Sequence, residues 1–222
     1  MSARWARLAC TAATVLLAGA ASAGAQQPRA CLEDAMIVFD ASKSMAASDD
    51  DNKGLRRIDS VRGALAKVLP RVAPKRRLGL MSYGPGSAPD ACQNVTLDFP
   101  PAPNAAKQIM DRVNGLLPDG RTPLTTAVRM AAESLEYWRR PVTIVLVTDG
   151  EESCGLDPCA LAKQLKSDGV RVTIHVISYK IGASLGSKGV FHAKCLADTS
   201  DGLYVATDTL DELVSALDQA LL

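Results

Sequence analysis

Short runs of apolar residues alternate with amphipathic helical patterns along this chain, and that alternation constrains the fold more than any other feature. Residues 35–39, 78–81 and 142–147 are apolar runs of strand length, and residues 170–177 alternate apolar and polar side chains. Residues 93–99 follow a turn rich in glycine and proline, so we expect them to form an antiparallel edge strand. The pattern predicts an α/β fold: a doubly wound, mostly parallel sheet of about six strands with helices on both faces.

Apolar residues spaced three and four positions apart mark the helices between these strands. The predicted helices cover residues 58–72, 104–117, 124–138, 157–167 and 209–222, and another begins near residue 189. In the third of them, the apolar stripe runs from Leu124 to Trp138, and Pro123 stands where a first helical turn tolerates proline. Thr209 and Glu212 have the spacing of a capping box, which would begin the last helix.

The first 25 residues have the composition of a secretory signal peptide. Arg4 and Arg7 form a basic start, residues 8–20 are small and apolar, and residues 21–25 offer two A-x-A cleavage sites. The apolar part is too short to span a bilayer well, although an uncleaved membrane anchor is the alternative. We therefore expect an exported protein, periplasmic or secreted, with a signal peptide at 1–25, a short segment at 26–32 and one domain at 33–222. No later segment approaches the roughly 18 apolar residues of a membrane helix, so we expect no stable membrane insertion after cleavage.

The charge balance bears on the class of partner. Removal of the signal peptide takes away two arginines and no acids, which changes the net charge from +1 to about −1. A near-neutral chain with dispersed charge lacks the basic face that is typical of nucleic-acid binding, so nucleic acid is not an expected partner. Short basic clusters such as Arg56-Arg57 stand near the ends of predicted elements, and we expect them to lie on a solvated face.

Five cysteines remain beyond the signal peptide: Cys31, Cys92, Cys154, Cys159 and Cys195. Export permits disulfide bonds, but the sequence does not determine their connectivity. Cys154 and Cys159 lie close together in one loop and are the first expected pair. A zinc site is the alternative, which is disfavoured because no C-x-x-C pair or histidine stands at ligand spacing.

Three separate stretches place oxygen-bearing side chains at the ends of predicted elements. In chain order they are Asp40, Ser42 and Ser44 after the strand at 35–39, Thr122 before the helix at 124–138, and Thr148 and Asp149 after the strand at 142–147. Each stretch alone has an ordinary explanation, because aspartate and serine suit loops and a threonine before a helix is often its N-cap. In a doubly wound sheet, however, the carboxyl ends of the strands meet at one crevice. Their joint occurrence favours one shared site.

The segments DASKSM, GRTPL and VTDGEE, in this order and spacing, resemble the metal-ion-dependent adhesion site of the von Willebrand factor type A domain. The resemblance spans about residues 33–222. The loop DGEESCGLDPCALAKQLK further resembles a bacterial exported branch of that family, which carries cysteines after the third motif. Many members have glycine at the place of Lys43, a position that supplies no ligand.

The resemblance implies a divalent cation held by five residues: Asp40, Ser42, Ser44, Thr122 and Asp149. It implies that the three hydroxyls ligate the ion directly, whereas the two carboxylates act largely through water or accept hydrogen bonds from those hydroxyls. Mg²⁺ is the expected ion and Mn²⁺ or Ca²⁺ the alternatives, because all three accept oxygen ligands. Neutral hydroxyls do not cancel the charge of the ion, so its open position would attract an Asp or Glu carboxylate from a protein partner.

Other interpretations compete with this one. Asp49, Asp50 and Asp51 could hold a second cation, but a solvated acidic loop is the favoured interpretation. The segment GASLG matches the G-x-S-x-G motif of serine hydrolases around Ser184. A hydrolase triad would need an acid between Ser184 and His192, and the sequence has none there.

The remaining alternatives also lack support for catalysis. His175 precedes the serine and is expected to be a satisfied core residue, and GASLGSKG fails as a phosphate loop because Ser187 replaces the required glycine. We therefore expect no catalytic residue and no enzyme. A metal-independent interaction domain, which would bind partners through loops such as 154–159, is the alternative to metal-dependent binding.

Overall fold

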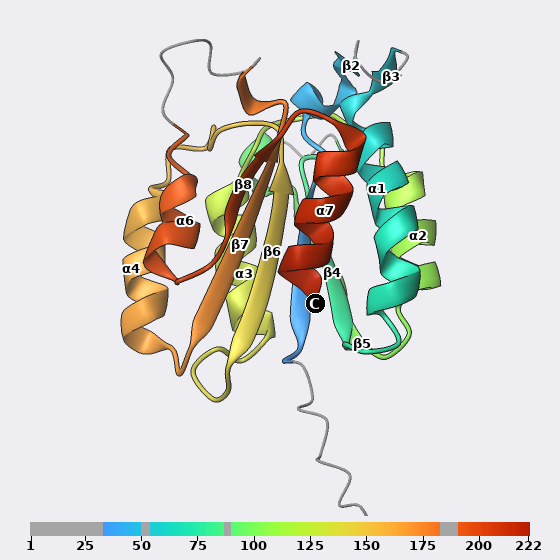
Figure 1. Ribbon diagram of the computed structural model, residues 1–222. Helices are drawn as coiled ribbons and strands as arrows, with labels where there is room; N and C mark the ends of the chain where they lie inside the picture. The colour runs from blue at the N-terminus through green and yellow to red at the C-terminus, as the bar shows by residue number, and fades with distance from the viewer. Residues whose placement is uncertain (1–32, 50–53, 87–89, 183–190) are drawn as a thin grey trace, which may run out of the picture. The chain divides into compact units, whose positions relative to one another are not determined.

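The computed structural model describes residues 33–49, 54–86, 90–182 and 191–222 (Figure 1). Six strands of this described part form one sheet in the order β5-β4-β1-β6-β7-β8, in which only the β4–β5 pair is antiparallel. They are β1 (Ala35–Asp40), β4 (Leu78–Tyr83), β5 (Val95–Ala102), β6 (Val142–Thr148), β7 (Val172–Tyr179) and β8 (Tyr204–Thr207). The predicted doubly wound sheet with one antiparallel edge strand is confirmed.

The helices divide between the two faces of the sheet. One face carries α1 (Arg57–Val72), α2 (Ala106–Gly115) and α7 (Leu210–Leu221), and the other carries α3 (Leu124–Ser134), α4 (Pro158–Asp168) and α6 (Lys194–Thr199). Figure 1 shows α7 across the near face of the sheet and α3 behind it. Each face therefore has its own hydrophobic core.

The central strand β1 belongs to both cores because its side chains alternate between the faces. Ile37 and Phe39 pack with α1, α2 and α7, whereas Met36 and Val38 pack with α3, α4 and α6. Every residue of β1 is buried. A strand that is covered on both sides has no polar face, which explains why the sequence shows it as a continuous apolar run.

Helix α3 ends earlier than predicted. Its last residue is Ser134, and Glu136 adopts a left-handed φ of 56°, which an α-helix cannot accommodate. The prediction that Trp138 continues the buried stripe is therefore wrong: its ring packs edge-on against Tyr137, and the residue is 51% exposed.

Some elements were missed by the apolar patterns, and one local motif is confirmed. Strand β8 and the small hairpin of β2 (Ser48–Asp49) and β3 (Leu55–Arg56) are short and partly exposed, so they have no apolar run of strand length. At the start of α7, Thr209 Oγ1 accepts a hydrogen bond from the Glu212 N–H, and the Glu212 carboxylate accepts one from the Thr209 N–H. This capping box confirms the predicted beginning of the last helix.

The carboxyl ends of the parallel strands β1, β6 and β7 meet at one edge of the sheet, the upper edge in Figure 1. Asp40 ends β1, Thr148 ends β6 and Tyr179 ends β7. The hairpin β2–β3 and the beginning of α1 lie at the same edge. This edge therefore collects the polar segments that the sequence singled out.

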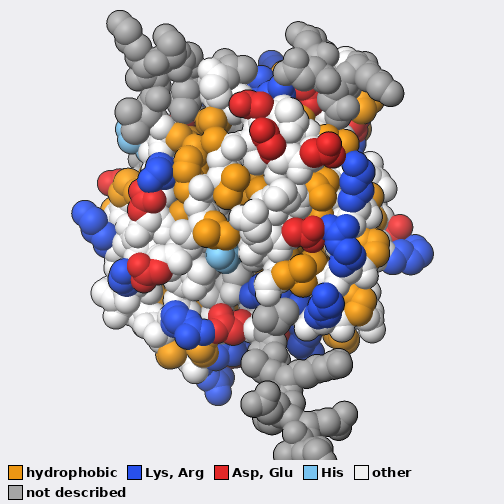
Figure 2. Space-filling view, in the orientation of Figure 1, with side chains coloured by type: hydrophobic (Ala, Val, Ile, Leu, Met, Phe, Trp, Pro, Cys, Tyr) orange, Lys and Arg blue, Asp and Glu red, His pale blue; other side chains and the backbone are white. Residues whose placement is uncertain are grey.

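Charged side chains of both signs are interspersed on the face shown in Figure 2. In the part of the chain that the structure describes, none of the helices combines the length and the apolar character needed to cross a membrane.

Candidate metal centre

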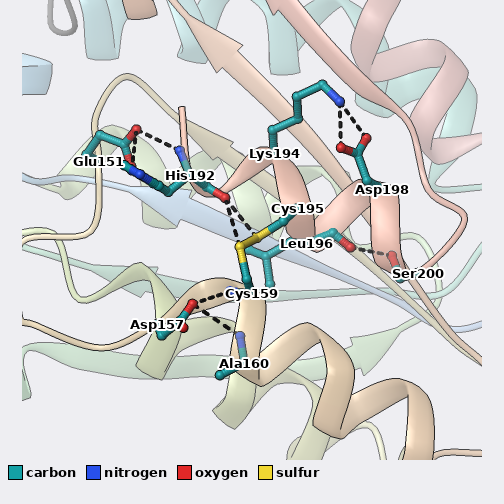
Figure 3. The surroundings of a disulfide bond; sticks show 10 residues. All are labelled: Glu151, Asp157, Cys159, Ala160, His192, Lys194, Cys195, Leu196, Asp198 and Ser200. Carbon is teal, nitrogen blue, oxygen red and sulfur yellow. Dashed lines mark hydrogen bonds and ion pairs between the residues drawn. A yellow bond between two sulfur atoms is a disulfide. The ribbon is translucent and has the colours of Figure 1, made fainter. Parts of the chain in front are cut away.

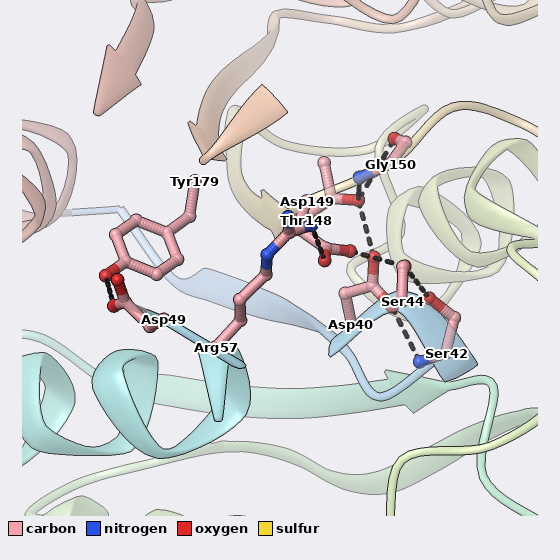
Figure 4. Close-up of polar contacts among 9 residues, drawn as sticks. All are labelled: Asp40, Ser42, Ser44, Asp49, Arg57, Thr148, Asp149, Gly150 and Tyr179. Carbon is pink, nitrogen blue, oxygen red and sulfur yellow. Dashed lines mark hydrogen bonds and ion pairs between the residues drawn. The ribbon is translucent and has the colours of Figure 1, made fainter. Parts of the chain in front are cut away.

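Both carboxylate oxygens of Asp40 accept hydrogen bonds at the end of β1 (Figure 4). The backbone N–H of Ser42 donates to Oδ1 at 2.7 Å, and the Thr148 hydroxyl donates to Oδ2 at 2.6 Å. Asp40 and Thr148 are fully buried. The carboxylate is therefore held in one orientation between the ends of two neighbouring strands.

Burial raises the pKa of Asp40 from its ordinary 3.8 to about 6, and the nearby Asp149 carboxylate acts in the same direction. The hydrogen bonds from Ser42 and Thr148 oppose this rise in pKa without cancelling it. Two buried carboxylates that repel one another form a place where additional positive charge is stabilising.

Ser42 and Ser44 lie on either side of the exposed Lys43, at the 3-10 turn η1 (Lys43–Ala46). The two serine Oγ atoms are 3.1 Å apart, and Ser44 Oγ donates a hydrogen bond of 2.6 Å to Asp149 Oδ1. Ser42 is 1% exposed and Asp149 is fully buried. The first and third motif segments are thus in direct contact through their predicted ligands.

Thr122, the predicted ligand of the second segment, lies close to the same place. A Cβ atom on Gly150 would stand 3.5 Å from Ser44 Oγ and 4.0 Å from Thr122 Oγ1. The two hydroxyls therefore line the same space beside Gly150, although they belong to different loops. Since glycine has no side chain, that space stays free for another group.

The sequence position of Thr122 suggests an N-cap for helix α3, but Thr122 does not cap this helix. Pro123 precedes the helix without a side-chain cap, and the carboxylate of Glu152 instead accepts from the Thr125 N–H at 2.8 Å. The Thr122 N–H donates to Ser153 Oγ at 2.8 Å, and the Ser153 N–H donates to the Thr122 carbonyl at 3.1 Å. These bonds connect the second motif segment to the third.

The donor set fits a hard divalent cation. It consists of two carboxylates and three hydroxyls from three segments, and oxygen donors of this kind suit Mg²⁺, Mn²⁺ or Ca²⁺. Within the described ranges, no group of three or more His, Cys, Asp or Glu side chains is placed to hold a metal. Any ion at this edge would therefore depend on the hydroxyls as well as on the carboxylates.

Arg57 also belongs to the site, although its sequence context predicted a solvated position for it. Its Nη1 donates to Asp149 Oδ2 at 2.8 Å, and its side chain is only 11% exposed, so it does not lie on a solvated face (Figure 4). Its neighbour Arg56, with a side chain 44% exposed, pairs with Asp59 at the surface as expected. Sequence reasoning had no signal to separate the two arginines, because only the direction of the first turn of α1 distinguishes them.

The prediction of a solvated acidic loop is wrong for Asp49, and Asp50 and Asp51 lie outside the described residues. Asp49 is 2% exposed; its Oδ2 accepts hydrogen bonds from Tyr179 and from Ser60, the latter at 2.8 Å. Lys180 Nζ lies 3.7 Å from Oδ1. Burial opposes ionisation, but the hydrogen bonds and the lysine charge outweigh it and lower the pKa of Asp49. Asp49 thus connects the hairpin β2–β3 to α1 and β7.

The expected Cys154–Cys159 disulfide is wrong. Cys154 pairs with Cys92. Cys159 pairs with Cys195, and Figure 3 shows this second bond. Cys159 lies in the first turn of α4, where it is directed at Cys195 in α6. Cys92, the partner of Cys154, lies in the connection between β4 and β5. The first bond therefore joins the loop after β6 to the connection between β4 and β5, and the second joins α4 to α6. Cys31 lies outside the described residues.

The loop after β6 borders an open groove beside the candidate centre. Its lining residues are Glu151, Glu152, Gly155, Leu156, Asp157, Pro158, Cys159 and His192. The carboxylate of Glu151 accepts from the His192 N–H at 2.9 Å, so the groove wall is connected to the segment before α6. Glu152 and Asp157 likewise accept backbone N–H groups. Leu156, which is 48% exposed, is an apolar residue of the groove.

Of the residues weighed for the hydrolase alternative, the structure describes the two histidines, His175 and His192. Ser184 falls outside the described residues. His175 Nδ1 accepts a hydrogen bond from the Leu203 N–H at 3.0 Å, so the histidine is satisfied as expected, but it is only partly buried and does not belong to the core. The His192 ring is 72% exposed and lies 3.7 Å from Glu151.

Comparisons with known proteins agree with the fold. The family model of the von Willebrand factor type A domain matches residues 35–152, more than half of the 222 residues. Two uncharacterized proteins of Bacillus subtilis (strain 168) are similar in sequence. YwmD is 24% identical over 189 residues, which is 81% of each chain, and YwmC is 24% identical over 154 residues, which is 66% of each chain.

Solved structures with related folds include BatB from Bacteroides thetaiotaomicron, with a TM-score of 0.63 and 16% identity over 85% of this chain and 96% of BatB. The pilus adhesin SpaC from Lactobacillus rhamnosus GG has a TM-score of 0.63 and 14% identity over 86% of this chain and 30% of SpaC. Proximal thread matrix protein 1 from the mussel byssus, with a zinc-occupied MIDAS motif, has a TM-score of 0.57 and 18% identity over 85% of this chain and 47% of its own. At these identities the structural similarity concerns the fold alone. With the family match over residues 35–152, it shows that this chain belongs to the von Willebrand factor type A domain family.

Proposed function

We propose that this protein is an exported, non-catalytic adhesion domain that binds a divalent cation and, through it, a carboxylate of a protein partner. The proposed ligand set is Asp40, Ser42, Ser44, Thr122 and Asp149. Mg²⁺ is the proposed ion, with Mn²⁺ and Ca²⁺ as alternatives that the same oxygen donors accept.

One observation carries this proposal: the predicted ligands from three distant segments converge beside Gly150. Ser44 Oγ contacts Asp149 directly, and a Cβ atom on Gly150 would stand within 4.0 Å of the hydroxyls of both Ser44 and Thr122. The raised pKa of Asp40 adds an electrostatic reason, because positive charge at this place would stabilise its ionised form.

Each residue of the site has a separate task in this proposal. Ser42, Ser44 and Thr122 supply neutral oxygen donors, and Asp149 orients the Ser44 hydroxyl by accepting its proton in a hydrogen bond. Asp40 supplies negative charge that Thr148 holds in place. A bound divalent ion would supply an electrophilic position at which a partner Asp or Glu is attracted.

The similarity to a pilus adhesin and to a protein with a zinc-occupied MIDAS motif supports a role in protein binding. Two disulfides among the described residues support export to the periplasm or the medium, because such bonds persist in oxidising compartments. The non-catalytic assignment has its support in the sequence, where no acid stands between Ser184 and His192.

A metal-independent interaction domain is the second candidate, and the groove that Cys159 helps to line favours it. The exposed Leu156 and the disulfide-bonded loop could form a partner surface without any ion. The two candidates differ in one result: binding of a partner that persists in excess EDTA supports the groove, and binding that requires Mg²⁺ supports the metal centre.

Calorimetric titration of the metal-stripped protein with Mg²⁺, Mn²⁺ and Ca²⁺ tests the proposal. We expect one site in the wild type, and affinity weakened by about 10–100-fold in Ser44→Ala, which removes a ligand and its contact to Asp149. Ser167→Ala is the matched control, since Ser167 is exposed in α4. Absence of cation binding by the wild type would overturn the proposal.

A further inference from the structure

The beginning of α1 places a permanent positive charge against the candidate centre. Arg57 is the first residue of α1, and its guanidinium donates to Asp149 Oδ2 at 2.8 Å, on the side of the carboxylate opposite the oxygen that accepts from Ser44 (Figure 4). Asp149 is completely buried and the Arg57 side chain is 11% exposed. This ion pair is therefore only weakly screened by water or salt.

The position of Arg57 is built into the fold. Its backbone N–H donates to the Ala47 carbonyl at 2.9 Å, and one turn later Ser60 donates to the buried Asp49 at 2.8 Å. These bonds attach the first turn of α1 to the segment that follows Ser42 and Ser44. The guanidinium is thus held at the site by the same segment that carries two of the proposed ligands.

Arg57 changes the net charge of the centre both before and after a divalent ion binds. Asp40 and Asp149 with Arg57 carry a net charge of −1 when both carboxylates are ionised. A divalent ion changes that sum to +1, whereas without the arginine the occupied centre would be neutral. A centre that remains positive attracts a further carboxylate, and a centre that starts with less negative charge binds the ion less tightly.

We propose that Arg57 sets the balance between cation affinity and carboxylate capture: it stabilises Asp149 while no ion is bound, weakens cation binding, and leaves the loaded centre positively charged toward an acidic partner. This inference rests on the proposed function and names Arg57 as a positioning and charge-setting residue rather than a ligand.

Arg57→Gln tests this proposal, with Arg57→Lys as the charge-retaining variant and Arg56→Gln as the matched control. Arg56 is adjacent in sequence, but its guanidinium pairs with Asp59 at the surface. In calorimetric titrations with Mn²⁺ and Mg²⁺, we expect Arg57→Gln to bind the ion at least about tenfold more tightly than the wild type. Arg57→Lys should stay close to the wild type, and Arg56→Gln should not differ from it.

Capture of a carboxylate is measured separately with acetate as the probe. Acetate is titrated into the Mn²⁺-loaded proteins, and its binding is followed through the relaxation of water protons by the bound ion. Arg57→Gln should bind acetate several-fold more weakly, even though it holds the ion more tightly. These opposite shifts are specific to a charge-setting role, because a variant that only disturbed the structure would bind both the cation and acetate more weakly.

The outcomes separate this inference from the proposed function. If the wild type binds no cation, the proposed function fails and the inference fails with it. If the wild type binds but Arg57→Gln has unchanged or weaker cation affinity, the inference alone is overturned. If Arg57→Gln does not fold, the ¹⁵N–Hε resonance of Arg57 in the wild type decides: it should shift on Mg²⁺ saturation while that of Arg56 does not, and an unshifted signal overturns the inference.

Discussion

Ser44 Oγ donates a hydrogen bond of 2.6 Å to Asp149 Oδ1, although 105 positions separate the two residues in the chain. The contact exists because β1 and β6 are parallel neighbours, so the segments that follow them leave the sheet at the same edge. Such a contact is specific to this strand order: if another strand lay between β1 and β6, the two side chains would be about 5 Å farther apart. The arrangement of the candidate metal centre is therefore a direct product of the topology.

Asp40 should make the metal-free protein less stable as the pH rises from about 4 to about 6. Burial and Asp149 raise its pKa from 3.8 to about 6, so the unfolded chain releases this proton before the folded protein does, and stability declines across that interval. Below pH 3.8 the effect is absent, and above about 6 it is complete, at most about 3 kcal/mol. Unfolding in EDTA at several pH values measures it.

Asp40→Asn supplies the control for this pH dependence, because it removes the titrating group and keeps the shape of the side chain. The difference in unfolding free energy between the two proteins should change between pH 4 and pH 6 and stay constant outside that interval. Identical pH profiles would show that Asp40 does not carry the penalty. Saturating Mg²⁺ should reduce the difference, since the ion stabilises the ionised carboxylate.

Gly84→Ala should destabilise the protein by at least about 2 kcal/mol and weaken cation binding. Gly84 has a φ of 98°, and a Cβ atom there would stand 2.4 Å from the backbone nitrogen of Ser42. Gly86→Ala is the matched control: its φ is 109°, but a Cβ atom would meet only the Asn94 side chain at 4.0 Å. Thermal unfolding and calorimetry compare the two, and an equal loss of cation affinity in both would contradict a role for the Gly84–Ser42 contact.

The disulfide pairs can be mapped directly. Cleavage before Asp157 separates Cys154 from Cys159, so non-reduced digests should contain one linked peptide pair with Cys92 and another with Cys195. A Cys154–Cys159 linkage in mass spectra would contradict this connectivity.

Removal of the Cys92–Cys154 bond should lower both stability and cation affinity. The bond spans 62 positions, and replacing both cysteines by serine should cost up to about 4 kcal/mol. The bond holds Cys154, which follows Ser153, and the Ser153 hydroxyl accepts a hydrogen bond from the Thr122 N–H. Loss of the disulfide should therefore loosen the segment that carries Thr122. The Cys159–Cys195 double variant should lose similar stability but less affinity, and calorimetry checks the contrast.

Asp49→Asn should destabilise the protein by about 1–3 kcal/mol without changing the number of bound cations. Asparagine keeps the size of Asp49 but removes the negative charge that Lys180 faces at 3.7 Å. Because the pKa of Asp49 is lowered, its contribution is present above the ordinary value of 3.8 and is lost as the pH falls through the lower folded value. Loss of a second cation in titrations of this variant would revive the acidic-loop site that the buried contacts of Asp49 oppose.

The sequence predicted the parts of this structure that depend on burial along the chain. The run at 142–147 had to lie inside the sheet because both of its faces are apolar, and Asp40 and Asp149 stood out because they end such runs. Strand β8 was missed because it has only four residues at the sheet edge and most of them are partly exposed, so it shows no apolar run of strand length.

Side-chain direction and pairing between distant loops were not predictable from the sequence. Arg56 and Arg57 are adjacent residues of the same type, yet the first turn of α1 directs one to the surface and the other to Asp149. Likewise, sequence distance favoured a Cys154–Cys159 bond, whereas the loops that the fold brings together determined the actual pairs.

Anomalous diffraction from crystals of the Mn²⁺-loaded protein locates the bound ion. We expect one strong peak beside Gly150, within ligand distance of the hydroxyls of Ser42, Ser44 and Thr122. A peak that lies instead against Asp49 or in the groove near Glu151, or the absence of any peak at saturating Mn²⁺, would contradict this expectation.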